Sequence, residues 1–436
     1  MSMSLAVAVL LLGVADSMVG SYFVLFVTEV AGLTPLQTGL FVSVHGAGGI
    51  MIAWLAGRSF DIRPSRGYAA AAMLSGGVAL WLMTVIRSYP LLILLAVTLL
   101  GALAAAFPQL FSLARHVLGD GPAAGRSVPL LRSVWSLAWA TGPLLGAVVL
   151  TAAGFSAILR SAAVVLMVAA CWVLIAVPRP GPPCPPGRHG SEAGPGLPRT
   201  AAVLLTCSVT LFYTAMFAGS VAMPLFVTRD LAQSDSAVGV LFSVCAAVEV
   251  VAALLLAAVP ARISQRLVIL AGMSCFVFFF TLTVAARGLT GLIAGQVVRG
   301  IAVAVVGAAG IRWFQDVMAP ATGRATTLFA NATTAGMVIA GVFAGGAVSL
   351  LGYTGTLLLC GAVTLSAAVA FALGTAAHSG RPPPESSRPS SPLDGPPPLP
   401  GGAATEPPGG HRPRTVLPAA RRPAPDEPGR VPRRDR

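Results

Sequence analysis

Four ionisable side chains lie inside long apolar segments of the sequence, where a charge is costly. Asp16 and His45 fall near the middle of two such segments in the first half of the chain, and Glu249 and Arg299 do so in the second half. A charge at the centre of a bilayer costs several kcal/mol, so such groups usually face a water-filled pathway or one another. The pattern predicts that Asp16, His45 and Glu249 take part in proton coupling.

These residues also have a purely structural interpretation. Glu249 and Arg299 have opposite charges at similar depth, and could form a neutralising pair that fixes helix packing. His45 could be a neutral histidine held by hydrogen bonds. Asp16 has no basic residue at its depth in the first half, which favours a carboxylate that binds and releases protons.

The sequence contains none of the common catalytic patterns. It has no H-E-x-x-H zinc motif and no G-x-S-x-G nucleophile turn, and a phosphate loop ending in G-K is impossible because there is no lysine. The six cysteines are scattered, mostly in apolar stretches, without the spacing of a disulfide framework or a zinc site. We therefore expect no enzyme, no metal site and no cofactor, and ATP is excluded as the direct energy source.

The composition indicates which solvent surrounds these polar residues. Hydrophobic residues make up 56% of the chain, charged residues 10%, and the mean hydropathy is +0.82, whereas soluble domains carry roughly 25% charged residues. Apolar segments of about 20 residues, the length that crosses a bilayer, recur along the chain. We expect an all-α membrane protein with twelve transmembrane helices, at residues 4–27, 36–57, 67–87, 90–115, 128–153, 156–177, 200–227, 235–259, 265–286, 290–317, 322–350 and 353–375.

Two proline-rich segments interrupt this pattern and define the domains. Their density of proline and glycine excludes helices, and the second also lacks apolar periodicity. The predicted domains are a six-helix bundle at residues 1–177, a cytoplasmic linker at 178–199, a second six-helix bundle at 200–375 and a disordered Pro/Arg-rich cytoplasmic tail at 376–436.

The placement of the arginines predicts the orientation of the chain. The net charge is +13, but the basic residues follow the loops and the tail rather than one face, so no nucleic-acid partner is expected. If the N-terminus is inside, the cytoplasmic loops hold Arg58, Arg63, Arg66, Arg115, Arg126, Arg179, Arg188, Arg199, Arg262, Arg266, Arg312 and Arg324. The outer loops then hold only Arg87, Arg160, Arg229 and Arg287. The positive-inside rule predicts a multi-pass protein of the inner cell membrane with both termini cytoplasmic.

The two halves of the chain are copies of each other. Shifted by 200 positions, FVTEVAGLTPLQTGLFVSV from Phe26 aligns without a gap on FVTRDLAQSDSAVGVLFSV from Phe226. At nearly the same shift, PAAGRS from Pro122 aligns on PATGRA from Pro320. Six spans separate the copies, so they run in the same direction. Parallel six-helix repeats are typical of transporters whose halves rock about a site near the midplane of the membrane.

Three stretches resemble a known family. They are FPQLFSLAR at 107–115, SLAWATGPLLG at 136–146 and WFQDVMAPATGRATTLFANAT at 313–333. The chain resembles the major facilitator superfamily, and within it the sugar efflux transporters, over roughly residues 10–375. This resemblance implies that the first, fourth, seventh and tenth spans line a central cavity, which places Asp16 and Arg299 where solute or protons pass.

The loop between the second and third spans resembles a conserved loop of the superfamily. In GRSFDIRPSR, Gly57, Asp61 and Arg66 fit the pattern, but Pro64 stands where a glycine is usual. The corresponding segment of the second half, PARISQR at 260–266, lacks the aspartate. The resemblance implies a charged latch that changes with conformation in the first half.

Sugars need hydrogen-bonding groups and aromatic faces in the cavity. The candidates for substrate binding are Tyr22, Phe107, Gln109, Trp139, Tyr213, Gln296, Arg299 and Asn331, although each could instead serve packing. We expect a monomeric, proton-coupled exporter of sugars or glycosides. The alternative is a multidrug or other small-molecule exporter of the same superfamily, because cavity linings diverge while the scaffold persists.

Overall fold

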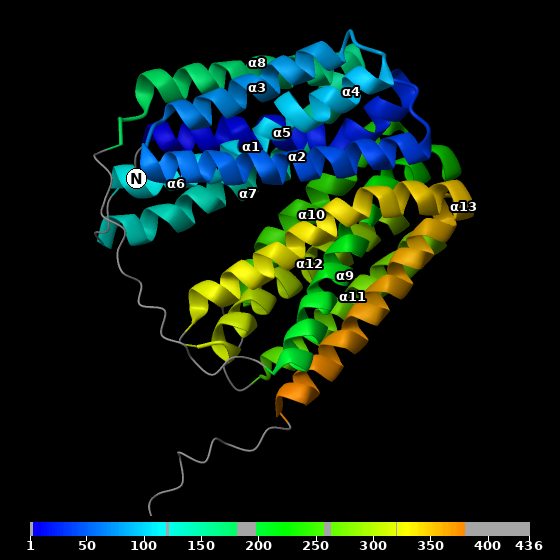
Figure 1. The fold of residues 1–436 in the computed structure, drawn as a ribbon. Coiled ribbons are helices and arrows are strands. Elements are labelled where there is room, and N and C mark those ends of the chain that lie inside the picture. The colour runs from blue at the N-terminus through cyan, green and yellow to red at the C-terminus, as the bar shows by residue number, and fades with distance from the viewer. Residues whose placement is uncertain (1–2, 119–121, 181–197, 257–262, 320, 380–436) are drawn as a thin grey trace, which may run out of the picture. The chain divides into compact units, whose positions relative to one another are not determined.

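The computed structural model describes residues 3–118, 122–180, 198–256, 263–319 and 321–379 (Figure 1). Every regular element in these ranges is a helix. Most of the predicted tail and most of the predicted linker lie outside the described residues. Residues 376–379, which were predicted to begin the tail, instead belong to the last described helix, which ends at Ser379.

The first half contains ten helical segments between Met3 and Ala176. They are α1 (Met3–Leu25), η1 (Phe26–Val30), α2 (Pro35–Ile62), α3 (Gly67–Met83), α4 (Tyr89–Leu95), η2 (Ala96–Leu100), α5 (Gly101–Leu103), α6 (Ala106–Leu118), α7 (Pro122–Ala153) and α8 (Phe155–Ala176), where η marks a π-helical turn. The second half contains α9 (Arg199–Leu225), η3 (Phe226–Asp230), α10 (Asp235–Leu256), α11 (Gln265–Ala285), α12 (Leu289–Val317) and α13 (Thr322–Ser379).

The described helices are consistent with twelve membrane spans. Ten are long and apolar enough to cross a bilayer, and the 17-residue Gly67–Met83 is slightly shorter. The longest, α13, is interrupted at Gly352, whose φ of 68° is left-handed and therefore breaks the helix into two. The protein is an all-α membrane protein, as the composition predicted.

The internal repeat seen in the sequence has a counterpart in the backbone. The aligned segments Phe26–Val30 and Phe226–Asp230 both form a π-helical turn, and the spans Tyr89–Val117 and Leu289–Val317 are both 29 residues long. One difference is that the first of these two spans is broken by η2, whereas α12 is continuous. At this break Gly48 of α2 packs so closely on the backbone of Val97 that a larger residue would collide with it.

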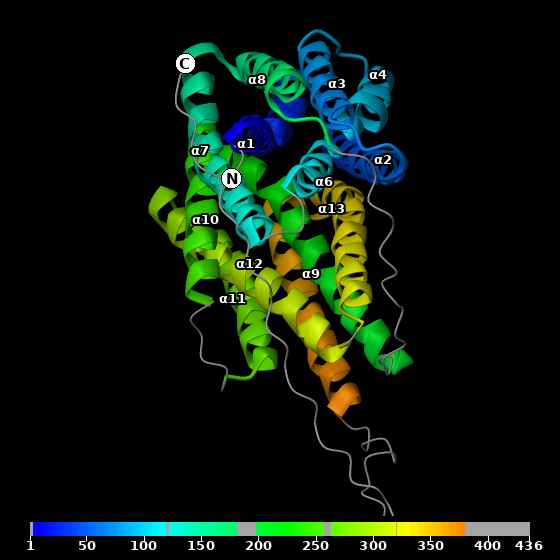
Figure 2. The same cartoon turned by 90° about the vertical axis from the view of Figure 1, so that its left-hand side faces the viewer.

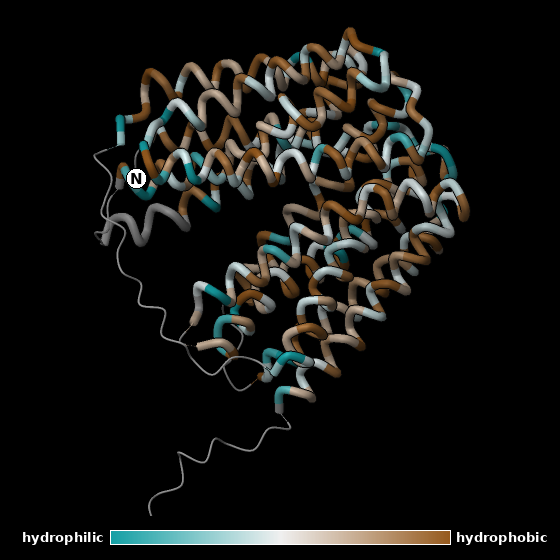
Figure 3. Tube along the Cα trace, in the orientation of Figure 1, coloured by the Kyte–Doolittle hydropathy of each residue, from teal (hydrophilic) through white to brown (hydrophobic). Residues whose placement is uncertain are grey.

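The surface of the bundles is apolar where a soluble protein would be polar. Leu350, Ile175 and Leu254 are 85%, 82% and 70% exposed. Figure 3 shows that hydrophilic positions gather at helix ends and loops, while apolar positions run along the helices. Contiguous exposed apolar surface of this kind is stable only against lipid.

The two halves meet through two helix pairs, α2 with α13 and α7 with α10, which lie on opposite sides of the molecule (Figure 2). Gly39 packs against the backbone of Gly341 and Gly345, and a Cβ at position 39 would overlap with it. Gly239, the repeat equivalent of Gly39, packs in the same way against the Pro143 carbonyl. These glycines permit close approach of the helices, and they lie near the end of the bundles where α1 passes into η1, which we name the Glu29 end.

Candidate functional site

Arg299 occupies the centre of the second half. Its side chain on α12 is only 7% exposed. Its Nη2 donates to Ser220 Oγ at 2.6 Å, and its Nη1 donates to Gln296 Oε1 at 3.3 Å. The guanidinium carbon lies 5.3 Å from the ring centre of Phe242 and 5.7 Å from that of Phe279. The cation is thus held by two neutral groups and two aromatic rings, and its Nε has no hydrogen-bond partner.

The predicted ion pair between Glu249 and Arg299 does not form in this structure. Gly300 packs against Cys245 and Val248 of α10, so Glu249 and Arg299 do lie at similar depth, as predicted. The Glu249 carboxylate is in electrostatic range of Arg299 and Arg132, but among the described residues the ion pair within 4.0 Å joins Glu29 and Arg229. The reason is that Ser220 and Gln296 already hold the guanidinium.

The first half contributes an aromatic cluster with unpaired polar atoms. The ring centres of Phe107 and Trp135 are 4.5 Å apart, and those of Trp135 and Trp139 are 6.4 Å apart. The indole Nε1 of Trp139 is buried without a hydrogen-bond partner. Gln109, only 2% exposed, keeps an unpaired Oε1. Buried polar atoms in native proteins are rarely left without a partner, so a water molecule or a solute can bond to these two.

Asp16 lies on α1 beside this cluster. Gly13 packs against Trp135, and Gly20 packs against Trp139. Ser17 donates a hydrogen bond to the Ala138 carbonyl at 3.0 Å, so this face of α1 is fixed on α7. Asp16 borders the same face and is partly buried. No described residue forms a hydrogen bond or an ion pair with its carboxylate.

His45 has a different environment from Asp16. Its ring lies 6.4 Å from that of Phe23 and against the backbone of Ala96, the first residue of η2. Its Nδ1 is buried without a partner. The contact with the backbone of Ala96 favours the structural interpretation, in which His45 holds α2 against the broken fourth span.

Tyr22 serves packing between the halves rather than an open cavity. It is fully buried, and its hydroxyl donates to the Pro143 carbonyl at 3.3 Å and packs on Gly239. Pro143, in the SLAWATGPLLG stretch of the fifth span, therefore lies in the α7–α10 interface, whereas the neighbouring Gly142 packs against Ser17 of α1. Tyr22 was predicted to bind solute, but in this structure its hydroxyl already donates its hydrogen bond to Pro143.

The other substrate candidates of the second half fall into different environments. Tyr213 is buried against Phe329 and Phe217, with ring centres 6.0 and 6.1 Å away. Gln296 is fully buried and donates to the sulfur of Met223 at 3.0 Å, which fixes it as a support for Arg299. Asn331 is exposed on α13.

The conserved-loop residues tie helix ends together through the backbone. Arg66 donates to the Val177 carbonyl, just after α8, at 2.6 Å. Its repeat equivalent Arg266 donates to the Ala372 carbonyl near the end of α13 at 3.4 Å. Asp61 is exposed and forms no ion pair with any described residue, and a side chain at position 57 would meet no described atom within 4 Å of its Cβ. Of these three loop residues, only the arginine ties helix ends together in this structure, and Arg266 makes the same kind of contact in the second half.

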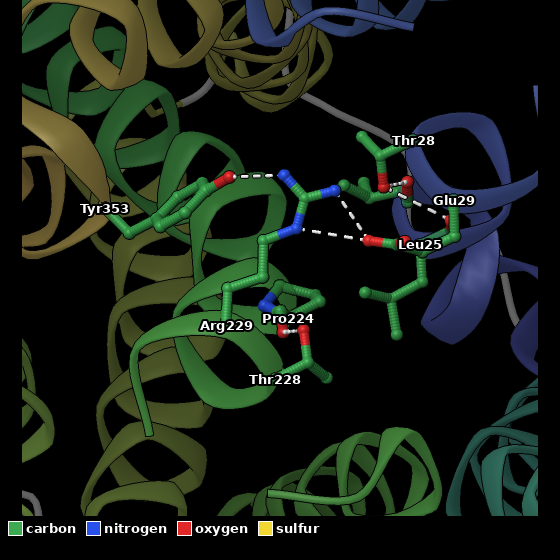
Figure 4. Close-up of polar contacts among 8 residues, drawn as sticks. Leu25, Thr28, Glu29, Pro224, Thr228, Arg229 and Tyr353 are labelled. Carbon is green, nitrogen blue, oxygen red and sulfur yellow. Dashed lines mark hydrogen bonds and ion pairs between the residues drawn. The ribbon is translucent and has the colours of Figure 1, made fainter. Parts of the chain in front are cut away.

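An ion pair joins the two halves at the Glu29 end (Figure 4). Arg229 donates to Glu29 Oε1 through Nε at 3.1 Å and through Nη2 at 2.6 Å, and its Nη1 donates to the Tyr353 hydroxyl at 2.8 Å. Glu29 and Arg229 occupy the same position of the repeat, in η1 and η3. Our sequence reasoning missed this pair, although opposite charges at equivalent positions of a two-fold repeat were the signal that could have found it.

No group of three or more potential metal ligands occurs within the described part of the chain. Ser220, Phe242 and Phe279 were not identified from the sequence, since a serine and two phenylalanines in apolar helices carry no distinctive signal.

Comparison with known proteins agrees with this architecture. The family model of the Major Facilitator Superfamily matches residues 205–424. A candidate sugar efflux transporter of Deinococcus radiodurans is 35% identical over 380 residues, covering 84% of this chain and 96% of the relative. Sugar efflux transporter A of Dickeya chrysanthemi is 28% identical over 375 residues, covering 84% and 94%.

Solved structures share the fold at low sequence identity. The nucleoside transporter NupG superposes with a TM-score of 0.69 at 14% identity, covering 86% of this chain and 98% of its own. A bacterial homolog of the human lysosomal transporter Spinster gives a TM-score of 0.67 at 12% identity, covering 86% and 96%.

Proposed function

We propose that this chain, which belongs to the major facilitator superfamily and within it to the group of sugar efflux transporters, exports sugars or glycosides across the cytoplasmic membrane by proton antiport. The relatives named above supply the solute class, and they match along most of their length. The fold supports a mechanism in which two homologous halves alternate the access to a site between them.

The observation that carries the solute class is the set of unpaired polar atoms in both halves. Gln109 Oε1 accepts hydrogen bonds, whereas Trp139 Nε1 and Arg299 Nε donate them, and all three lack partners. A sugar hydroxyl can donate and accept at once, so it can satisfy both kinds of group. The rings of Phe107 and Trp135 offer apolar faces beside them.

Asp16 is the proposed proton carrier. It lies beside the aromatic cluster, and no basic group of the described chain pairs with it. Glu249 is a second carboxylate in the same membrane region, but Arg299 and Arg132 are in electrostatic range of it. Asp16 is therefore the less compensated charge, and protonation is the simplest way to neutralise it. His45 is the remaining candidate.

The proposed orientation has both termini in the cytoplasm of the inner membrane, with the Glu29 end outside. The arginine-rich loops then lie inside, as the positive-inside rule requires. In this orientation the ion pair of Glu29 and Arg229 closes the outer end. The described state is the one that loads solute from the cytoplasm. The transporter is expected to work as a monomer.

The test is solute exchange by the purified full-length chain in proteoliposomes. Vesicles preloaded with unlabelled sugar should take up radiolabelled lactose, galactose or a glycoside by exchange, and protein-free vesicles should not. A parallel arm with a cationic dye tests the alternative of multidrug export. Exchange of the dye without exchange of any sugar would refute the proposed solute class and support that alternative.

A further inference from the structure

We propose that Arg299 determines specificity by binding a carboxylate of the solute, so that the substrates include acidic sugars such as hexuronates. This inference rests on the proposed function, since it concerns the same solute site. It names a chemical class that neutral-sugar export does not require.

The geometry of Arg299 is that of a prepared anion site. Ser220 and Gln296 fix the guanidinium from two helices, α9 and α12, and Gln296 is itself held by the sulfur of Met223. A guanidinium that is already oriented loses little entropy when it binds a ligand.

The guanidinium retains donors for a further partner. It has five N–H groups, of which two donate to Ser220 and Gln296. Nε has no partner, and it is adjacent to a terminal nitrogen in the planar fork that matches both oxygens of a carboxylate. The flanking rings of Phe242 and Phe279 keep water away and strengthen the attraction.

The charge of Arg299 has no carboxylate in contact with it among the described residues. A buried cation without such a contact is costly in a membrane protein. Glu249 interacts with Arg299 only at longer range, so no hydrogen-bonded carboxylate of the described chain neutralises the guanidinium. An anionic solute group provides that contact.

The internal repeat indicates that the fold does not require the cluster formed by Arg299, Gln296 and Ser220. The structural features of the fold occur in both halves, as the π-helical turns and the close-packed Gly39 and Gly239 demonstrate. The residues 200 positions before Arg299, Gln296 and Ser220 are Leu99, Ala96 and Gly20. An arginine cluster present in one half alone is explained by solute recognition rather than by helix packing.

The experiment compares galacturonate with galactose, which differ only in the carboxylate at C6. Exchange in proteoliposomes is measured for the wild type, Arg299→Gln, Arg299→Lys and Ser220→Ala, with Arg312→Gln as the control. Arg312 is an exposed arginine of the same helix. The wild type and the control should prefer galacturonate at least tenfold in half-saturating concentration. Arg299→Gln should lose the preference, because its galacturonate exchange should fall much more than its galactose exchange, whereas Arg299→Lys and Ser220→Ala should keep part of the preference.

The outcomes separate this inference from the proposed function. Exchange of galactose without a preference for galacturonate overturns the inference and leaves the proposed function intact. An unchanged preference in Arg299→Gln also overturns it. Absence of exchange for both sugars, and for the wider sugar screen, overturns the proposed function and the inference together. If Arg299 served only as the counter-ion of Glu249, Arg299→Gln would lower thermal stability and impair both sugars equally, which would again overturn the inference.

Discussion

Charge reversal at Glu29 should weaken the contact with Arg229 that closes the Glu29 end. Charge reversal at both Glu29 and Arg229 should restore this contact. Glu29→Arg replaces the ion pair to Arg229 by two facing guanidinium groups. The double variant Glu29→Arg with Arg229→Glu re-forms an ion pair of opposite polarity. Because the two residues are repeat equivalents on equivalent π-helical turns, the swapped pair has nearly the same backbone geometry.

The structure sets the size of the effect. The two side chains are 41% and 42% exposed, and exposed ion pairs contribute about 0.2–1 kcal/mol. Two like charges about 4 Å apart add a repulsion of roughly 1 kcal/mol in water and more in a lower dielectric. The single reversal should therefore shift the conformational equilibrium by about 2 kcal/mol, which is roughly a 30-fold change in population.

The assay measures the distance between spin labels at Ala31 and Leu231, which lie at the Glu29 end of each half, in a background without the native cysteines. The wild type should give a short distance, Glu29→Arg a larger fraction of long distances, and the double variant a return towards the short one. Glu29→Gln is the matched control, because it removes the ion pair without introducing repulsion. Identical distance distributions in all four proteins would refute the claim that this ion pair helps to close the Glu29 end.

Three further predictions follow from the same contacts. Asp16→Asn mimics the protonated carboxylate and should abolish efflux driven by a pH gradient while sparing exchange; normal gradient dependence in radiolabelled efflux would exclude Asp16 and redirect attention to Glu249 or His45. Trp139→Phe keeps an aromatic ring but removes the unpaired indole donor; it should raise the half-saturating sugar concentration about three- to tenfold, with unchanged thermal stability, and an unchanged concentration would show that Nε1 does not contact solute. Gly39→Val forces a side chain into the backbone of Gly341 and Gly345. Overpacking of this kind should cost about 1–3 kcal/mol and favour the state that is open at the Glu29 end. The control Gly57→Val, at a glycine without such a close contact, should leave the spin-label distances unaltered.

The fold was largely predictable because membrane insertion imposes a simple pattern. Long apolar segments and the 200-position repeat predicted helices that the structure contains, including equivalent spans in each half. The break in the fourth span was not predictable, since Ala96–Leu100 has an ordinary apolar composition. It depends on how Gly48 and Val97 pack, which is a tertiary effect.

The site was less predictable because depth along a helix does not fix the direction of a side chain. Gln109, Trp139 and Arg299 were identified from residue type, and each proved to carry an unpaired polar atom. Tyr22 had a suitable residue type but lies in the interface with Pro143. Glu249 was placed at the correct depth, yet Arg299 is held by Ser220, a residue that no sequence pattern distinguishes.

The measurement that tests the central claim most directly is proton-driven sugar transport in inverted membrane vesicles that contain the full-length chain. Acidification of the vesicle lumen should drive the accumulation of radiolabelled sugar, and an uncoupler that collapses the pH gradient should release it. Asp16→Asn vesicles should equilibrate the sugar without accumulating it. Accumulation that persists after the gradient is collapsed, or no sugar uptake above that of vesicles lacking the protein, would contradict the assignment of this chain as a proton-coupled sugar exporter.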